Sequence, residues 1–171
     1  FNNDYTYYYP DYVPAQSALN LYGAGDARYD AYFAKAATGY SHQLTWPLLI
    51  KYYGNRELMS LMIYHVNMPK PLRLAEQYLI RAEAYCNLGN FGSATADVVA
   101  LRKARGVSGS ISVNEDNWLD VIDDERVREL YMEGFRLNDL KRWGRGFERT
   151  PQSNIQAEGS NLKVEAGNPR F

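Results

Sequence analysis

Three glutamates at regular helical spacing are the residues of this sequence that could most directly do chemistry. Glu125, Glu129 and Glu133 follow one another in four-residue steps, and residues four apart lie on the same face of an α-helix. Two carboxylates flanking a glycosidic bond are the catalytic groups of most glycoside hydrolases, so a glycosidase that uses Glu129 or Glu133 is one interpretation. Spacing on one helix, however, defines neither an opposite wall nor the position of a nucleophile or a water.

Basic residues around the same glutamates favour a structural interpretation. These residues are Arg126, Arg128, Arg136, Lys141 and Arg142. A buried carboxylate is costly unless it is hydrogen-bonded, and the guanidinium fork of arginine can donate two bonds at once. We therefore predict a structural salt-bridge network between helices and no catalytic residue. The predicted members of the network are Arg81, Glu125, Glu129, Glu133, Arg136, Asp139 and Arg142. Earlier in the chain, Asp26 and Arg28 are expected to pair as a separate clamp.

Helices must position these side chains, and the clearest helical pattern covers residues 71–106. Apolar residues recur at intervals of three and four in its first half, which predicts one helix, and a second helix follows after a short turn. Gly89 is expected to end the first helix and Asn90 to cap the second, which should end at Arg105-Gly106. The alternation of small and large residues is that of a tetratricopeptide repeat, so a protein-binding tetratricopeptide scaffold is an alternative function.

A third long helix is expected to carry the glutamates. Ser112 and Glu115 have the spacing of a capping box at its start. Gly134 should break this helix, and residues 136–144 should then form a short amphipathic turn. Residues 150–171 are polar and rich in glycine and asparagine, which predicts a loop.

The first part of the chain predicts shorter elements. Aromatic and aliphatic runs at 44–53 and 58–66, separated by Gly54-Asn55, indicate an irregular β-hairpin. Pro47 would then lie on an edge strand or at a bulge. Short helices are expected from Val13-Pro14 and after Asp26, because proline is tolerated in a first helical turn and aspartate caps one.

Composition excludes several classes of protein. The 171 residues are 46% hydrophobic and 23% charged, as expected of one globular domain. A net charge of −1 offers no basic surface to a nucleic acid. Cys86 is the single cysteine, and His42 and His65 have no carboxylate at ligand spacing, so we expect no disulfide, metal or cofactor. No apolar run is long enough to span a membrane.

Tyrosine is in surplus, with 15 residues, and many of them lie in the extended stretch 1–12. A tyrosine presents an apolar ring with a hydroxyl at its rim, which suits stacking on the face of a sugar. The alternative is that these rings only cover the core. The ligand-binding candidates are Tyr7, Tyr8, Tyr9, Tyr12 and Trp46.

Several motifs, taken together and in this order, resemble the SusD/RagB family. The first motifs are Asp26-Ala27-Arg28-Tyr29, Tyr32-Phe33, Lys70-Pro71-Leu72-Arg73-Leu74-Ala75-Glu76 and Tyr78-Leu79-Ile80-Arg81-Ala82-Glu83-Ala84. The later ones are Arg102, Arg105-Gly106, Glu125-Arg126, Glu129-Leu130, Glu133-Gly134, Arg136, Asp139-Leu140 and Arg142-Trp143-Gly144. The last series is the specific part of the resemblance.

The resemblance implies a mainly α fold, a SusD-like α-α superhelix with tetratricopeptide-like helix pairs, a small β-hairpin and long irregular loops. Residues 1–171 would be the C-terminal part of such a domain, with the helix pair at 71–106, the helix motif at 117–144 and the N-terminal half absent. It also implies non-catalytic binding of a polysaccharide or oligosaccharide at the outer-membrane surface of a bacterium. The implied partners are the glycan, a TonB-dependent transporter of the SusC type and the membrane itself, reached through a lipid anchor outside this sequence.

Overall fold

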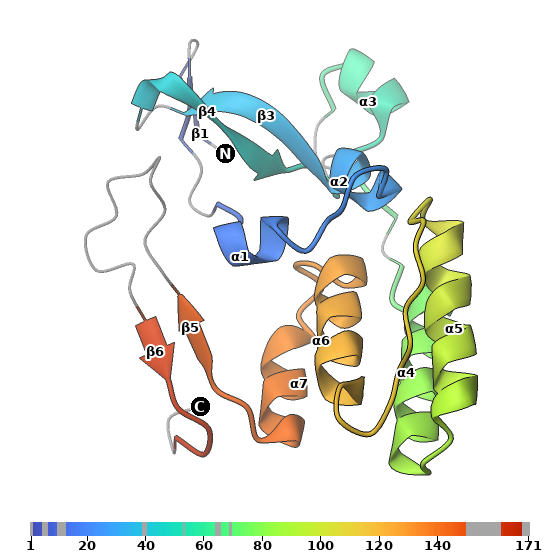
Figure 1. The fold of residues 1–171 in the computed structure, drawn as a ribbon. Coiled ribbons are helices and arrows are strands. Elements are labelled where there is room, and N and C mark those ends of the chain that lie inside the picture. Colours follow the sequence, from blue (N-terminus) through green and yellow to red (C-terminus); the bar gives the residue numbers. More distant parts are fainter. Residues whose placement is uncertain are drawn as a thin grey trace.

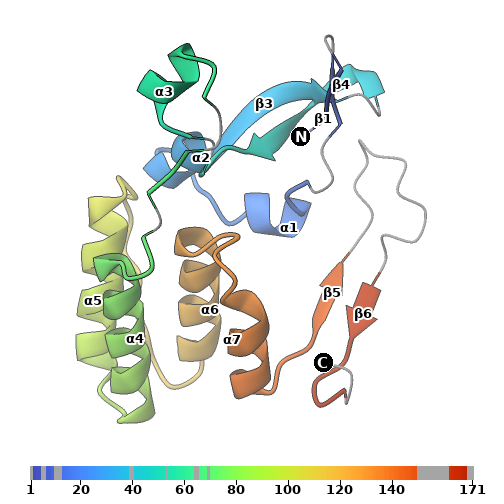
Figure 2. The same cartoon turned by 180° about the vertical axis from the view of Figure 1, so that it is seen from behind.

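Helices make up most of the regular secondary structure of the described residues. The computed structural model describes residues 2–4, 7–9, 13–38, 41–52, 54–63, 66–68, 70–149 and 162–168. Helices α4 to α7 lie side by side in one layer, and the strands β3 and β4 lie beyond one end of it, with α1 and α2 in between (Figure 1). The opposite view shows the same order, with β5 and β6 beside α7 (Figure 2).

The predicted helix pair forms α4, Leu74–Asn87, and α5, Phe91–Ala104. Gly89 adopts a φ of 72°, and the side chain of Asn90 accepts a hydrogen bond from the backbone N–H of Ser93 at 3.2 Å. Both features were predicted, and they turn α5 back along α4. The buried side chains between the helices include Ala82, Ala94 and Val98.

Helix α5 ends where it meets the start of α2, Ala27–Tyr32. Gly106 has a φ of 75°, and a Cβ on it would lie 2.9 Å from the carbonyl oxygen of Gly25. The backbone N–H of Ala27 donates to the carbonyl oxygen of Arg105 at 3.0 Å. This close approach is what requires glycine at position 106.

The third long helix, α6, runs from Trp118 to Glu129, and α7 from Arg136 to Trp143. The predicted capping box is wrong, because the helix starts after Asn117, well past Ser112 and Glu115. Asparagine side chains shape the preceding turn instead: the backbone N–H of Asn114 donates to the Asn117 amide oxygen at 2.9 Å. Helix α6 also ends before Glu133, so the third glutamate lies in the turn to α7 rather than on the helix.

The β-hairpin is displaced from its predicted position. Strand β4, Ser41–Leu49, pairs with the preceding strand β3, Phe33–Thr38, and residues 56–60 form the helix α3, Arg56–Ser60. The side chain of Asn55 accepts from the backbone N–H of Glu57 at 2.8 Å, which starts a helix instead of a hairpin turn. Pro47 lies on the edge strand β4, as predicted.

The smaller elements complete the fold. Strands β1, Asn2–Asp4, and β2, Tyr7–Tyr9, join β3 and β4 in one sheet of order β1-β2-β3-β4, and α1 spans Gln16–Leu19. The loop prediction for 150–171 is corrected at one point, because β6, Leu162–Val164, pairs with β5, Phe147–Arg149. Among the described residues, no helix has the length and apolar character needed to cross a bilayer.

Candidate functional site

The glutamates of α6 lie at the centre of a cluster of ion pairs between four parts of the chain. Glu125 and Glu129 are fully buried, with no exposed surface on either side chain. Cations from four other segments meet these glutamates: Arg28 comes from α2, Lys51 from the segment after β4, Arg73 from the start of α4, and Arg105 from the end of α5. We call these residues, with Glu133, the glutamate cluster.

Glu129 is held by three arginines. Arg105 donates through Nε at 3.0 Å and Nη2 at 2.8 Å, and Arg73 donates through Nη1 at 3.0 Å. The Nη1 atom of Arg28 adds a longer bond of 3.3 Å. Burial alone would raise the pKa of the Glu129 carboxyl, but the hydrogen bonds from Arg105 and the charges of all three arginines outweigh it and lower this pKa. The group is therefore an ionised, saturated acceptor.

Glu125 is satisfied in the same way. It accepts from Arg28 Nη1 at 2.7 Å and from Arg128 Nη2 at 2.6 Å. The Arg28 guanidinium also forms a two-bond pair with Asp26, at 2.8 and 2.7 Å, while Asp26 caps α2 by accepting from the backbone N–H of Arg28. The predicted clamp between Asp26 and Arg28 thus extends into the glutamate cluster.

Glu133 joins the cluster from the turn after α6. Its carboxylate pairs with Lys51 and with Nη2 of Arg73, the latter at 2.7 Å. Lys51 also donates to the backbone carbonyl oxygen of Glu129 at 2.9 Å. Burial lowers the pKa of Lys51, although Glu133 acts in the opposite direction. The cluster therefore also fixes the C-terminal end of α6.

The other predicted network members form ion pairs outside this cluster. Asp139 accepts from Arg126 at 2.7 Å and pairs with Arg142 at 3.0 Å, and Arg142 reaches Glu83 on α4 at 2.7 Å. Arg136 pairs with Asp123. Arg81 pairs with Asp97 at 2.6 Å across the α4–α5 pair, on a side chain that is 56% exposed. The structure therefore brings Glu125, Glu129 and Glu133 together and leaves Arg81, Arg136, Asp139 and Arg142 outside that cluster.

The cations that satisfy Glu129 were not predicted as its partners. Arg73 and Arg105 lie next to the ends of helices, and Lys51 lies in an irregular segment, so no helical period relates them to α6. One signal in the sequence pointed to Arg105: it directly precedes the glycine that ends a helix, where a cation lies near the negative end of the helix dipole. The pairing itself required the tertiary fold.

Four of the five stacking candidates belong to strands of one sheet. Tyr7, Tyr8 and Tyr9 form β2, and Trp46 lies in β4, opposite Ala36 of β3. Their side chains are outside the described part of the structure, as is all of Tyr12. His65 and the side chain of His42 are also outside it, so the metal prediction is not tested there.

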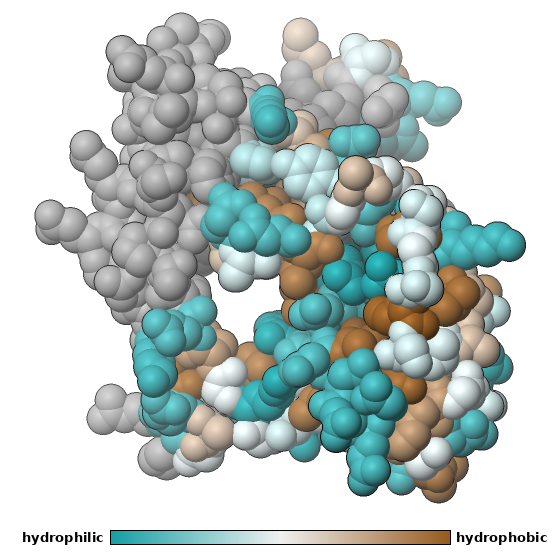
Figure 3. Space-filling view, viewed as in Figure 1, coloured by the Kyte–Doolittle hydropathy of each residue, from teal (hydrophilic) through white to brown (hydrophobic). Residues whose placement is uncertain are grey.

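A cavity of about 740 Å³ lies apart from the glutamate cluster, between α1, α6, α7 and β5. Its walls are mostly apolar, and the turn after α6 contributes Leu130, Tyr131, Met132, Gly134 and Phe135 to them. The space-filling view shows an opening on this face between the β5 strand and the helices (Figure 3). Volumes of this order are typical of small-molecule sites.

Comparison with known proteins agrees with the fold and with the sequence motifs. The sequence profile of the SusD family matches residues 3–169. The chain belongs to the SusD family. A search of curated proteins matches this SusD-family chain to the starch-binding protein SusD of Bacteroides thetaiotaomicron, with 44% identity over 73 residues. That match covers 42% of this chain and 12% of the relative.

A solved structure supports the fold of this SusD-family chain. The structure is that of a SusD-like carbohydrate binding protein from Bacteroides vulgatus, with a TM-score of 0.62 and 22% sequence identity. The superposition covers 93% of this chain and 35% of that protein. The predicted SusD-like, mainly α fold is thereby confirmed, and the chain spans about a third of the length of that solved relative.

Proposed function

We propose that this protein binds a polysaccharide or oligosaccharide at the bacterial cell surface without cleaving it. The observation that carries the proposal is the match to the SusD family over residues 3–169. The name of the starch-binding relative makes an α-glucan the first ligand to test. On this proposal the protein delivers the bound glycan to a TonB-dependent transporter of the SusC type.

The geometry of the glutamate cluster supports a non-catalytic role. A glycosidase needs one carboxylic acid that donates a proton and a second carboxylate that reaches the sugar or a water. Glu129 has no exposed surface and accepts from three arginines, and its lowered pKa keeps it ionised. Glu125 is equally buried and paired. These glutamates are therefore unsuited to acid catalysis.

Stacking by aromatic rings of β2 and β4 is the proposed mode of glycan binding. The candidates remain Tyr7, Tyr8, Tyr9, Tyr12 and Trp46. Four of them belong to β2 or β4, the strands on either side of β3, and Tyr12 lies outside the described residues. A sugar ring presents apolar C–H faces and hydroxyls at its edge, and an aromatic ring with a polar rim can meet both.

Attachment to the outer membrane through a lipid anchor outside this sequence is part of the same proposal. A surface-anchored binding protein beside a transporter raises the local concentration of glycan at the pore. The family membership is the support for this location.

Calorimetric titration of the full-length protein with malto-oligosaccharides and other soluble glycans tests the proposal, with reducing-sugar release assayed in the same samples. We expect binding to one glycan class without release of reducing ends. Trp46→Ala should weaken that binding about tenfold, whereas Tyr78→Ala on α4, outside the candidate set, should not. Release of reducing ends would show an enzyme instead, and no binding to any glycan would favour the protein-binding scaffold.

A further inference from the structure

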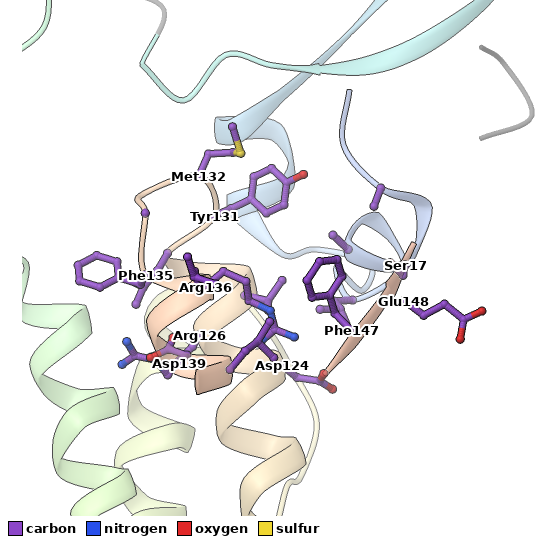
Figure 4. Close-up of a pocket in the computed structure, with 18 residues that line it drawn as sticks. Ser17, Asp124, Arg126, Tyr131, Met132, Phe135, Arg136, Asp139, Phe147 and Glu148 are labelled. Carbon is purple, nitrogen blue, oxygen red and sulfur yellow. The ribbon is translucent and has the colours of Figure 1, made fainter. Parts of the chain in front are cut away.

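The cavity between α1, α6, α7 and β5 has the composition of a ligand site, and nothing in the proposed function uses it. Its apolar walls include Leu21, Val127 and Leu140. Aromatic rings come from two elements: Tyr131 from the turn after α6 and Phe147 from β5. Figure 4 shows the Phe147 ring directed from β5 toward α6 and α7, with the Tyr131 ring on the α1 side of the same space.

Most charged groups of this cavity are already engaged with protein partners. Arg126 donates to Asp139 at 2.7 Å, and both side chains are buried. Arg136 is paired with Asp123. These guanidinium groups are therefore committed to neighbouring carboxylates, and the pairs hold α7 against α6. Figure 4 shows Arg126 and Asp139 next to each other below the aromatic rings.

Asp124 differs from the other charged groups. Within the described part of the chain, its carboxylate makes no hydrogen bond and no ion pair, although it lines the cavity. Burial raises the pKa of this carboxyl, while Arg128 acts against that rise, and Asp120 and Glu125 add to it. Asp124 is exposed at the edge of the cavity, so its carboxylate is open to a ligand and can accept a hydrogen bond from a hydroxyl or an amino group.

Apolar and aromatic walls together with a carboxylate suit a sugar as ligand. A sugar residue offers C–H faces to apolar and aromatic walls and offers hydroxyl donors to a carboxylate. An acidic sugar would place its own negative charge beside Asp124 and near Glu148, which also lines the cavity. Among the described lining residues, the carboxylates of Asp124, Asp139 and Glu148 outnumber the guanidinium groups of Arg126 and Arg136, and each arginine is already paired with a carboxylate, so the repulsion is not offset.

We propose that this cavity is a second carbohydrate subsite, which takes a neutral or amino sugar residue on Phe147 and Asp124 and discriminates against uronic acids. The proposal rests on the proposed function, since it names part of the ligand class. The subsite lies beside β5 and α7, separate from the aromatic candidates of β2 and β4.

The test is calorimetric titration of the full-length protein with malto-oligosaccharides, amino-sugar oligomers and oligogalacturonate. Phe147→Ala and Asp124→Asn should each weaken binding of the neutral or amino-sugar oligomers about tenfold. Asp116→Asn, an isosteric change of an exposed aspartate in the turn before α6, should leave binding unchanged. Binding of oligogalacturonate should be at least tenfold weaker than that of the neutral oligomers.

A readout at the site separates this proposal from the general one. In protein with labelled phenylalanine, the Phe147 ring resonance should shift on addition of the sugar. If the wild type binds sugar, but both variants bind as tightly and the Phe147 resonance stays in place, the subsite is refuted and the proposed function stands. If no sugar binds, both proposals fail. Equal affinity for oligogalacturonate and neutral oligomers would refute the proposed selectivity.

Discussion

Replacement of Glu129 by glutamine is the perturbation that most directly tests the glutamate cluster. The Glu129→Gln side chain has nearly the same shape as the original, so it removes a negative charge without opening a cavity. Three guanidinium groups, from Arg28, Arg73 and Arg105, would then face one neutral amide. The NH₂ group of the new amide would also place its N–H donors against the N–H donors of the arginines.

The magnitude follows from burial and from the partners that remain. Removing one member of a buried ion pair costs about 3–5 kcal/mol, because the other member stays buried and uncompensated. Glu129 is fully buried, but the side chains of Arg73 and Arg105 are 18% and 31% exposed and can recover some hydration. We therefore expect a loss of about 3 kcal/mol in the free energy of unfolding, at the low end of that range. In a domain of this size such a loss lowers the melting temperature by roughly 10 °C.

Urea denaturation followed by circular dichroism measures this loss, with Glu115→Gln as the matched control because Glu115 is exposed in the turn before α6. The control should change the unfolding free energy by less than about 0.5 kcal/mol. A Glu129→Gln variant that unfolds at the same urea concentration as the wild type would refute the reasoning. A variant with unchanged stability that had lost a glycan-cleaving activity would instead support the glycosidase interpretation.

Three further predictions concern acid stability, a close backbone approach and a helix cap. The pKa values of the Glu129 and Glu83 carboxyls are lower in the folded protein than in the unfolded chain. The two carboxylates should therefore stabilise the fold fully above the unfolded pKa of about 4.3, and this stabilisation should be lost as pH falls through the folded pKa values. Between pH 7 and 3, the urea midpoint should fall less steeply in Glu129→Gln than in the wild type. Gly106→Ala should destabilise by about 2 kcal/mol in urea unfolding, since φ is 75° and a carbonyl oxygen lies 2.9 Å from the new Cβ. Gly92→Ala on α5 meets nothing within 4 Å and should be neutral or stabilise by about 0.5 kcal/mol. Asn90→Ala removes the α5 cap and should cost about 1 kcal/mol, measured by thermal unfolding.

Local patterns predicted the parts of the fold that local interactions decide. The turn at Gly89 and Asn90 needs only a left-handed residue and a capping oxygen, and both are visible in the sequence. The predicted hairpin of residues 44–53 and 58–66 is wrong because strand pairing depends on residues that are distant from the turn. The sequence of residues 58–66 is apolar enough for a strand, but the side chain of Asn55 starts a helix there. Strand β4 pairs with the preceding strand β3 instead.

The glutamate cluster shows the same division. The four-residue spacing predicted that Glu125 and Glu129 share one face of α6. The cost of burying a charge predicted that arginines pair with them there. Periodicity could not extend to Glu133, which leaves the helix and still reaches the same cations because the turn after α6 folds back. Nor could it supply Arg73 and Lys51, whose positions depend on how separate segments pack.

The position of the cluster also relates the scaffold to the proposed binding surface. Arg28 lies on α2, which runs directly into β3, and Lys51 follows β4 closely. Because Phe33 pairs with Leu49, both cations lie at the same end of the β3–β4 pair, and they bind that end to α6. Charge-assisted hydrogen bonds are directional, so they fix the orientation of a sheet on a helix more tightly than apolar contact does. If Trp46 stacks on a sugar, loosening Lys51 should weaken glycan binding without touching the glycan. Lys51→Met, which keeps the length of the side chain and loses its bonds to Glu133 and Glu129, tests this: the affinity should fall while the selectivity among glycans is unchanged. A change in selectivity would mean that this part of the cluster contacts the ligand itself.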